Sequence, residues 1–448
     1  MLTKEQACER VHDIVARART AGADASDAVF AADRSLSVSV RMGALEDVER
    51  SESEELGLRV FVGRRSASVS TSDLSSASLD ALVERAIAMA REAPEDQWAG
   101  LAPESRLMHG APPHLDLDDG AEVDPPSLKQ RALAAEDAAR AVAGVTNSEG
   151  AGAGASRSIM ALATSHGFTG AYGQSSHGLS ASVLAGPAGA MERDHASHSA
   201  RYASMLEAPE LVGRRAGERA VARINPAKVQ SGAMPVVFDR RVSSGLVGHF
   251  LGAIAGAAIT RKTSFLLDRL GTQVFAKGVT ISDDPHRPRG LRSRPFDGEG
   301  LPVLPMKLVD AGMLETWLLD SASARQLNME PTGHASRGVG GAPGVAPSNL
   351  YMEAGHIPPE TLVGEISRGI LVTELIGQGV NGVTGDYSRG AAGFLIENGE
   401  ITQPVSEITI AGNLKDMFLA LTPANDLEFR FGINAPTLRI DGMTVAGA

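Results

Sequence analysis

Two kinds of hydrophobic periodicity alternate along this chain, and together they restrict the folds open to it. In residues 56–72, LGLRVFVGRRSASVSTS, apolar residues recur at every second position on both sides of Gly63, which is typical of two antiparallel strands joined by a turn. In residues 78–92, SLDALVERAIAMARE, they recur at helical spacing instead. Strand-like and helical runs then mix up to the C-terminus. The sequence therefore predicts an α+β fold with large antiparallel or mixed sheets and packed helices.

Changes in these patterns divide the 448 residues into three segments. A proline-containing stretch over residues 94–126 has neither periodicity, which places a boundary near residue 115. A helical run over 210–224 closes the second segment, and the short apolar run MPVVFD, 234–239, opens the third. We predict an N-terminal α+β domain over 1–115, a middle α/β domain over 116–228, and a C-terminal domain over 229–448 with mixed helices and antiparallel hairpins. In the last domain ENGE, 397–400, and IDGM, 440–443, contain pairs that favour tight hairpins.

Charge and hydropathy argue against two kinds of partner, nucleic acid and membrane. The formal net charge is −12, so the surface should repel a nucleic-acid backbone, and we expect no nucleic-acid partner. The longest apolar run, 245–259, is 15 residues long and falls short of the roughly 20 needed to span a bilayer. The first residues have no apolar core of signal-peptide length, so we expect no membrane segment and a cytoplasmic location.

A glycine-rich helical stretch is the first candidate for chemistry. From SSGLVGH, 243–249, onward, Ser244, Gly248, Gly252 and Gly256 recur every four residues and should share one helix face. Such a face predicts close packing against another backbone. His249 lies beside it, but a zinc hydrolase helix needs a second histidine and a glutamate, and neither is present. A buried helix with a single histidine is the interpretation we favour.

Three other groups of polar residues offer weaker candidates. Asp283, Asp284 and His286 cluster in SDDPHRPRG, where two prolines indicate a rigid loop. His334 and Arg337 lie among glycines that lack the ending of a phosphate-binding loop. We expect the third group to form one loop that contacts substrate or another subunit, or else a hydrogen-bonded turn; its members are Tyr387, Ser388 and Arg389. From the residues alone, no complete active site emerges.

Several long motifs of the third segment resemble the TldD/PmbA family, known as peptidase U62 or modulators of DNA gyrase, and specifically its PmbA (TldE) branch. They are SFLLDRLGTQVF at 264–275, RPFDGEGLP at 294–302, the run from GQGVNG to NLKDMF at 377–418, and IDGMTVAG at 440–447. The resemblance implies a family associated with zinc-dependent proteolysis. Its TldD branch has a His-Glu-x-x-x-His helix in the third domain and a later cysteine ligand.

When this chain is aligned with the motif, only one of the three motif residues, the second histidine, is present. Ser244 stands at the first histidine, Gly245 at the glutamate, and His249 at the second histidine. The single cysteine, Cys8, lies far away in sequence. The resemblance therefore implies no catalytic residue, metal ligand or cofactor in this chain, with His249 as a remnant of the motif.

The family also implies a heterodimer with a TldD-like catalytic subunit, which would hold the zinc and act on unfolded or extended peptides. In that arrangement this chain shapes the substrate chamber, with Tyr387, Ser388 and Arg389 as candidates for its lining or for the interface. Two alternatives stay open. The chain could be a metallopeptidase on its own, through His249 with Asp283, Asp284 or His286, or it could regulate DNA gyrase directly. Whether it forms a homodimer when alone is also left open.

Overall fold

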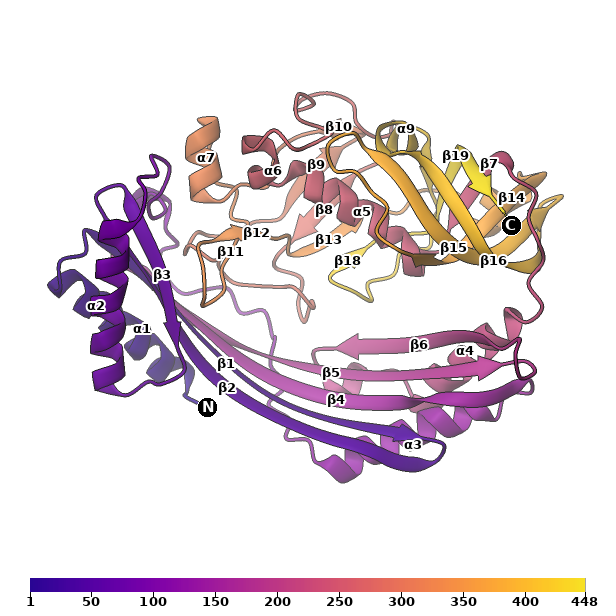
Figure 1. Ribbon diagram of the computed structural model, residues 1–448, viewed down its shortest axis with the longest axis horizontal. Helices are drawn as coiled ribbons and strands as arrows, with labels where there is room; N and C mark the ends of the chain where they lie inside the picture. The colour runs from indigo at the N-terminus through magenta and orange to yellow at the C-terminus, as the bar shows by residue number, and fades with distance from the viewer. Residues whose placement is uncertain (448) are drawn as a thin grey trace.

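The computed structural model describes residues 1–447 and is built from one long sheet and a separate C-terminal unit (Figure 1). The long sheet has the strand order β3-β2-β1-β4-β5-β6, and every neighbouring pair is antiparallel. Its strands are β1 (Ala25–Arg41), β2 (Ala44–Val62), β3 (Arg65–Thr71), β4 (Val145–Thr164), β5 (Thr169–Ala185) and β6 (Glu192–Ala200). The predicted turn at Gly63 joins β2 to β3.

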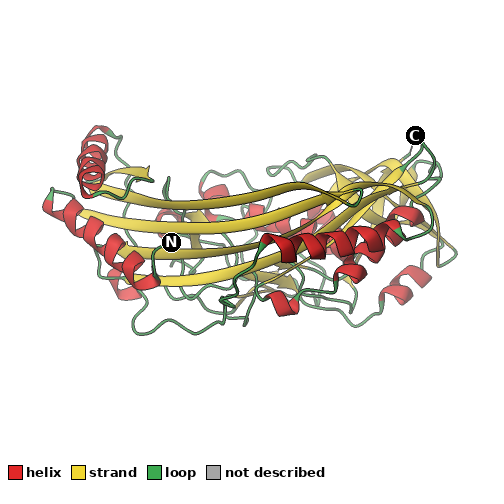
Figure 2. Ribbon diagram, turned by 90° about the horizontal axis from the view of Figure 1, so that it is seen from below, coloured by secondary structure: helices red, strands yellow, loops and turns green. Residues whose placement is uncertain are grey.

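All four long helices of this region cover one face of the long sheet. They are α1 (Lys4–Thr20), α2 (Ser76–Glu92), α3 (Pro125–Arg140) and α4 (Pro209–Ala222). On β1, Ala28, Phe30 and Ala32 enter one helix-packed core and Val38 and Val40 enter the other, because alternate side chains of a strand point to opposite faces. Figure 2 shows the helices in front of the long strands on this outer face.

Local signals explain where these helices begin. Thr3 and Gln6 form a capping box at the start of α1, as the sequence indicates. Asp124 caps α3, whose first turn contains two prolines that need no backbone N–H partner there.

The first two sequence segments share this single sheet. Strands β1–β3 come from the first segment and β4–β6 from the second, and the boundary placed near residue 115 falls in the irregular connection between them. That connection contains only the short 3-10 helix η1 (Glu104–Arg106), and another, η2 (Ala203–Met205), follows β6. Residues 1–115 and 116–228 therefore contribute two halves of one layer.

The C-terminal unit is mixed α+β, as the periodicity predicts. One sheet runs β16-β15-β14-β7-β19-β17, and an additional pairing of β16 with β19 closes it into a barrel. Its strands are β7 (Gly232–Phe238), β14 (Arg368–Ile376), β15 (Asp386–Glu397), β16 (Glu400–Asn413), β17 (Leu421–Pro423) and β19 (Leu438–Ala446). A second sheet, β10-β9-β8-β13-β18, uses β8 (Ile281–Asp284), β9 (Met306–Asp310), β10 (Met313–Leu314), β13 (Asn349–Met352) and β18 (Ile433–Asn434).

Short elements complete this unit. They are the pair β11 (Ala335–Ser336) and β12 (Gly344–Val345), and the helices α5 (Arg240–Ile254), α6 (Gly256–Thr260), α7 (Ser321–Leu327), α8 (Pro359–Gly364) and α9 (Leu414–Leu419). One large apolar core packs α5 against both sheets.

Of the two predicted hairpin turns, one is right and one is wrong. Asn398 and Gly399 both have positive φ and join β15 to β16 in a tight turn. Asp441 and Gly442 instead form a bulge within β19, where the register against β7 shifts between Ile440 and Met443. A bulge also uses a glycine with positive φ, so the local sequence signal is the same for both.

Candidate functional site

Helix α5 presents its glycines to open space. A methyl group added at Gly245, Gly248 or Gly252 would meet no atom of the described residues within 4 Å. The predicted face comprises Ser244, Gly248, Gly252 and Gly256, and its close packing is wrong for Gly248 and Gly252. Gly256, past the end of α5, is closely packed, but against the side chains of Ser323 and Leu319 and not against a backbone. The opposite side of α5, with Leu246, Val247, Phe250 and Ile254, is buried in the core.

His249 flanks this open face and contacts the start of strand β15. Its ring meets the ring of Tyr387 edge to face, with centroids 5.9 Å apart. Burial, and then the nearby Arg389 guanidinium, lower the pKa of His249 below its usual value. The imidazole is therefore neutral at physiological pH.

Tyr387, Ser388 and Arg389 do not form a loop, because they are the first residues of β15 after Asp386. They pair with β16 in the order Tyr387 to Gly412, Ser388 to Ala411 and Arg389 to Ile410. Successive side chains of the strand point to opposite faces. Tyr387 contacts the His249 ring and Arg389 lowers the pKa of His249. Ser388 is exposed on the other face, beside a different surface pocket lined by residues 378–382. The structure thus brings together two of the three predicted residues.

The Tyr387 hydroxyl is a buried polar group without a hydrogen-bond partner among the described residues. The side chain is 2% exposed, and burial raises its pKa to about 12. A buried hydroxyl without a partner costs about 1–3 kcal/mol of stability, so its retention beside His249 marks this position as a functional candidate.

The residues around His249 do not fit a zinc ion. A zinc site needs three or four nitrogen, sulfur or carboxylate ligands, and here the neighbours are a phenol, a guanidinium and glycine. Across residues 1–447, no group of three or more His, Cys, Asp or Glu side chains is arranged to hold a metal ion. Cys8 lies in α1, on the outer face of the long sheet.

The other polar candidates of the sequence have structural partners of their own. Asp283 lies in strand β8, not in a loop, and its carboxylate lies 3.3 Å from His334 Nε2. It also accepts from the backbone N–H of Ser348. Asp283, Asp284 and His286 are therefore not gathered with His249 into a cluster of metal ligands.

Arg337, from the same glycine-rich stretch, belongs to a buried ion cluster that the sequence did not suggest. It pairs with Asp27 of β1, which also pairs with Arg59 of β2, and all three side chains are buried. This cluster links the long sheet to the C-terminal unit. Three residues so far apart in sequence gave no pattern that could have predicted it.

The inner face of the long sheet is lined with serine and glycine. Residues directly opposite each other on β1, β4, β5 and β6 form two rows. The rows are Ser37, Gly154, Gly178 and Ser199, and Ser39, Gly152, Ser180 and Ser197. A cavity of about 430 Å³ lies over them. Small side chains leave the backbone of this face accessible, which suits contact with an extended chain.

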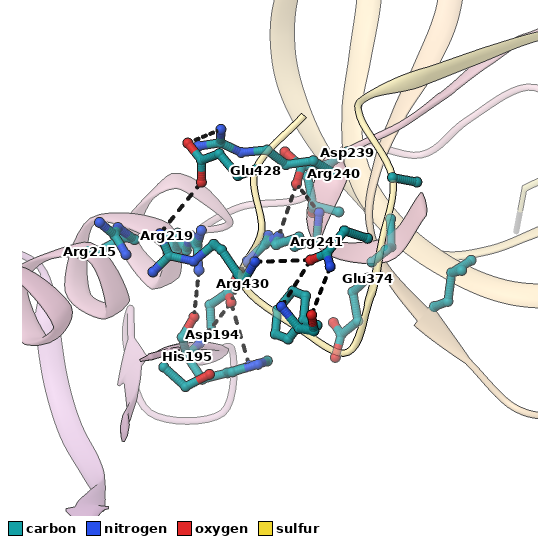
Figure 3. Close-up of a pocket in the computed structure, with 17 residues that line it drawn as sticks. Asp194, His195, Arg215, Arg219, Asp239, Arg240, Arg241, Glu374, Glu428 and Arg430 are labelled. Atoms are coloured by element: carbon teal, nitrogen blue, oxygen red, sulfur yellow. Dashed lines mark hydrogen bonds and ion pairs between the residues drawn. The ribbon is translucent and has the colours of Figure 1, made fainter. Parts of the chain in front are cut away.

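A second cavity, of about 480 Å³, lies where β6 and α4 meet the C-terminal unit (Figure 3). We call it the junction pocket. Its lining comprises Asp194, His195, Ser197, Arg215, Arg219, Asp239, Arg240, Arg241, Val242, Thr373, Glu374, Leu375, Glu428, Arg430, Phe431, Asn434 and Ala435. Asp194 is 3% exposed, and its two oxygens lie 2.9 and 3.1 Å from the Arg241 guanidinium at the start of α5. Although burial opposes it, pairing with Arg241 lowers the pKa of Asp194.

Comparison with known proteins places these features in a family. Three family models match in chain order: PmbA/TldA metallopeptidase domain 1 over residues 26–90, the central domain over 118–224, and the C-terminal domain over 231–447. The chain belongs to the PmbA/TldD family.

Within that family the similarity is to the PmbA branch. The chain is 41% identical to the metalloprotease PmbA of Escherichia coli O157:H7 over 426 residues, which covers 95% of this chain and 92% of the relative. A crystal structure from Bacteroides thetaiotaomicron, of a protein named for modulation of DNA gyrase, has a TM-score of 0.91 at 28% identity and covers 100% of both chains. TldE from Thermococcus kodakarensis has the same fold, with a TM-score of 0.88 at 20% identity over 98% of this chain and 100% of that one.

No helix within residues 1–447 is long and apolar enough to cross a bilayer.

Proposed function

We propose that this chain is the non-catalytic subunit of a cytoplasmic, two-subunit zinc metalloprotease that degrades or processes unfolded peptides. A TldD-like partner supplies the zinc, the bound water and the glutamate that takes its proton. This chain completes a chamber around the substrate and contributes surfaces that hold it.

One observation supports this division of labour above all others. At the position of the family's zinc motif, α5 has Ser244, Gly245 and His249, and its glycine face is open. A helix that has lost its ligands but keeps space beside them is suited to receive substrate and unsuited to activate water.

Two surfaces of the long sheet also fit a peptide. The serine and glycine rows of the long sheet expose backbone with little side-chain selectivity. Strand β6 pairs only with β5 among the described strands, so its other edge is available to an extended chain. Peptides that add to a sheet edge are held mainly by main-chain hydrogen bonds, which gives broad sequence tolerance.

The test compares the chain purified alone with the chain co-purified with its TldD-like partner. Zinc content is measured by elemental analysis, and activity on an unfolded fluorogenic peptide is measured in parallel. We expect peptidase activity and about one zinc per heterodimer, and neither activity nor stoichiometric zinc in the isolated chain.

Two variants separate the subunits' roles. His249→Ala in this chain should leave the zinc content of the heterodimer unchanged, whereas replacing the motif glutamate of the partner by glutamine should abolish activity. Stoichiometric zinc in the isolated chain that is lost in His249→Ala would overturn the proposal in favour of a self-sufficient metallopeptidase.

A further inference from the structure

The junction pocket contains one arginine that structural ion pairing does not explain. Five arginines line the pocket. Four of them have carboxylate partners: Arg215 and Arg430 both pair with Glu207, Arg240 pairs with Glu428, and Arg241 pairs with Asp194. The pairs of Arg430 with Glu207 and of Arg241 with Asp194 join the segment before α4 and strand β6 to the C-terminal unit, and the other two are internal to each part, so a structural role accounts for all four.

Arg219, on α4, is the exception. Its Nη1 donates to the backbone carbonyl of His195 at 3.1 Å, and no carboxylate of the described residues lies within 4.0 Å of its guanidinium. Burial, followed by repulsion from Arg241, lowers the pKa of Arg219 to about 10. This cation is partly removed from water, and Asp194 and Asp239 attract it only from beyond 4.0 Å, so an anionic ligand in direct contact would stabilise it.

The charges that line the pocket indicate how much negative charge it can accept. With Glu207, the partner of Arg215 and Arg430, the five arginines face five carboxylates, the others being Asp194, Asp239, Glu374 and Glu428. The pocket therefore has no excess of positive charge, and Arg219 is the one arginine in its lining without a carboxylate of the described residues within 4.0 Å. A carboxylate has one negative charge and two oxygens in the plane that a guanidinium matches, whereas a phosphate dianion would bring excess charge close to the acidic side chains.

The rest of the lining indicates what is attached to that charge. Val242, Leu375, Phe431 and Ala435 give the pocket an apolar wall beside the arginines. His195 and Ser197 of the edge strand β6 also line it, so a chain that runs along this edge would reach the pocket. The C-terminal residue of a peptide combines these elements: extended backbone, one side chain and one carboxylate.

We propose that the junction pocket binds the C-terminal residue of a peptide, with the Arg219 guanidinium holding the free carboxylate and the apolar wall holding the last side chain. This assignment rests on the proposed function, which makes the ligand a peptide. It adds that the C-terminal end of that peptide binds to this subunit.

The experiment uses the isolated full-length chain and two small probes, N-acetyl-leucine and N-acetyl-leucinamide. They differ only in the carboxylate, and ligand-observed NMR measures their dissociation constants at low salt. We expect the acid to bind at least about tenfold more tightly than the amide, since a charge-assisted hydrogen bond contributes about 1.5–3 kcal/mol. Arg219→Gln should remove this preference.

Arg214→Gln is the matched control. Arg214 is exposed on the same helix and has no ion pair in the described chain, so this variant changes net charge equally and should keep the preference for the acid. Thermal unfolding of both variants checks that they fold. If Arg219→Gln did not fold, the acid and amide comparison on the unmodified chain would still decide.

Equal binding of acid and amide, or an unchanged preference in Arg219→Gln, would overturn the assignment. Displacement of N-acetyl-leucine by an equal concentration of inorganic phosphate would also overturn it, because the site would then accept anions in general. No partner subunit is needed, so these outcomes are distinguishable from a failure of the two-subunit peptidase: the probe could bind here while the heterodimer proved inactive.

Discussion

Helices α4 and α5 both have glycines four residues apart, and the structure uses them in opposite ways. On α4, a methyl group at Gly213 would lie 1.9 Å from the carbonyl oxygen of Ala135, because this helix packs directly on α3. On α5, a methyl group at Gly248 would meet nothing within 4 Å in the described chain. Small residues at helical spacing therefore permit two things, close packing or free space, and only the second leaves room for a ligand.

The largest expected effect tests the packed helix. Gly213→Ala forces the α3 backbone away from α4, and we expect it to lower the free energy of unfolding by about 1–3 kcal/mol, as overpacking of a close contact does. Urea denaturation of the isolated chain measures it.

Gly245→Ala on α5 is the matched control. It removes the same glycine from a helix without any contact, so it should be neutral or stabilise the chain by up to about 1 kcal/mol. If both substitutions had the same effect, the contrast between the two helices would be wrong.

The second prediction concerns the space beside α5, and it depends on the proposed function. Gly248→Leu puts a large side chain on the open face, where its Cβ meets no described atom within 4 Å. We expect kcat/KM of the heterodimer on an unfolded peptide to fall by about tenfold, or 1.4 kcal/mol, while the urea midpoint of the isolated chain stays nearly constant. Arg214→Leu, which puts the same side chain on the exposed side of α4, should leave kcat/KM unchanged. Undiminished activity in Gly248→Leu would show that substrate does not use this face.

The smallest expected effect is a pH dependence of stability. Helix α4 is held to the C-terminal unit by ion pairs, whereas the open face of α5 has no such contact. Glu207 accepts from Arg215 of α4 and from Arg430. Although partial burial opposes it, these two guanidinium groups lower the pKa of Glu207 to about 2. A folded-state pKa below the unfolded value means that the stabilisation is complete above about pH 4.5 and is lost as the pH falls toward 2.

We therefore expect Glu207→Gln to destabilise the chain by about 1 kcal/mol at pH 7, a modest amount because the cluster is partly exposed and screened by salt. The difference from the unmodified chain should shrink between pH 4.5 and 2 in denaturation curves recorded at each pH. A difference that did not depend on pH would assign the loss to packing instead of charge.

Much of the secondary structure was predictable, because its determinants are local. The capping box at Thr3 and Gln6, the turn at Gly63 and the hairpin at Asn398 depend on residues within a few positions of each other. The resemblance of the long C-terminal motifs to the PmbA/TldD family is likewise confirmed, since each motif is a linear stretch of sequence. The bulge at Asp441 escaped prediction, because a hairpin and a bulge accept the same dipeptide and only the pairing with β7 decides between them.

The site was only partly predictable. His249, Tyr387 and Arg389 were found separately, but nothing in the sequence showed that a helix and a strand 138 residues apart would place them together. The junction pocket was missed altogether. It is assembled from β6, α4, α5, β14 and the segment before β18, and its arginines are distinguished only by which of them lack a carboxylate partner.

By itself the sequence determined the α+β class, the position of most helices and strands, and the resemblance to the PmbA/TldD family, since each depends on residue type, short-range spacing or a linear motif. Tertiary structure decided that two sequence segments share one sheet, that the glycines of α4 are packed while those of α5 are open, and that Arg219 has no anionic partner. The reason is physical: a residue's conformational preference is local, but whether its surface meets protein or open space depends on segments far away in the chain.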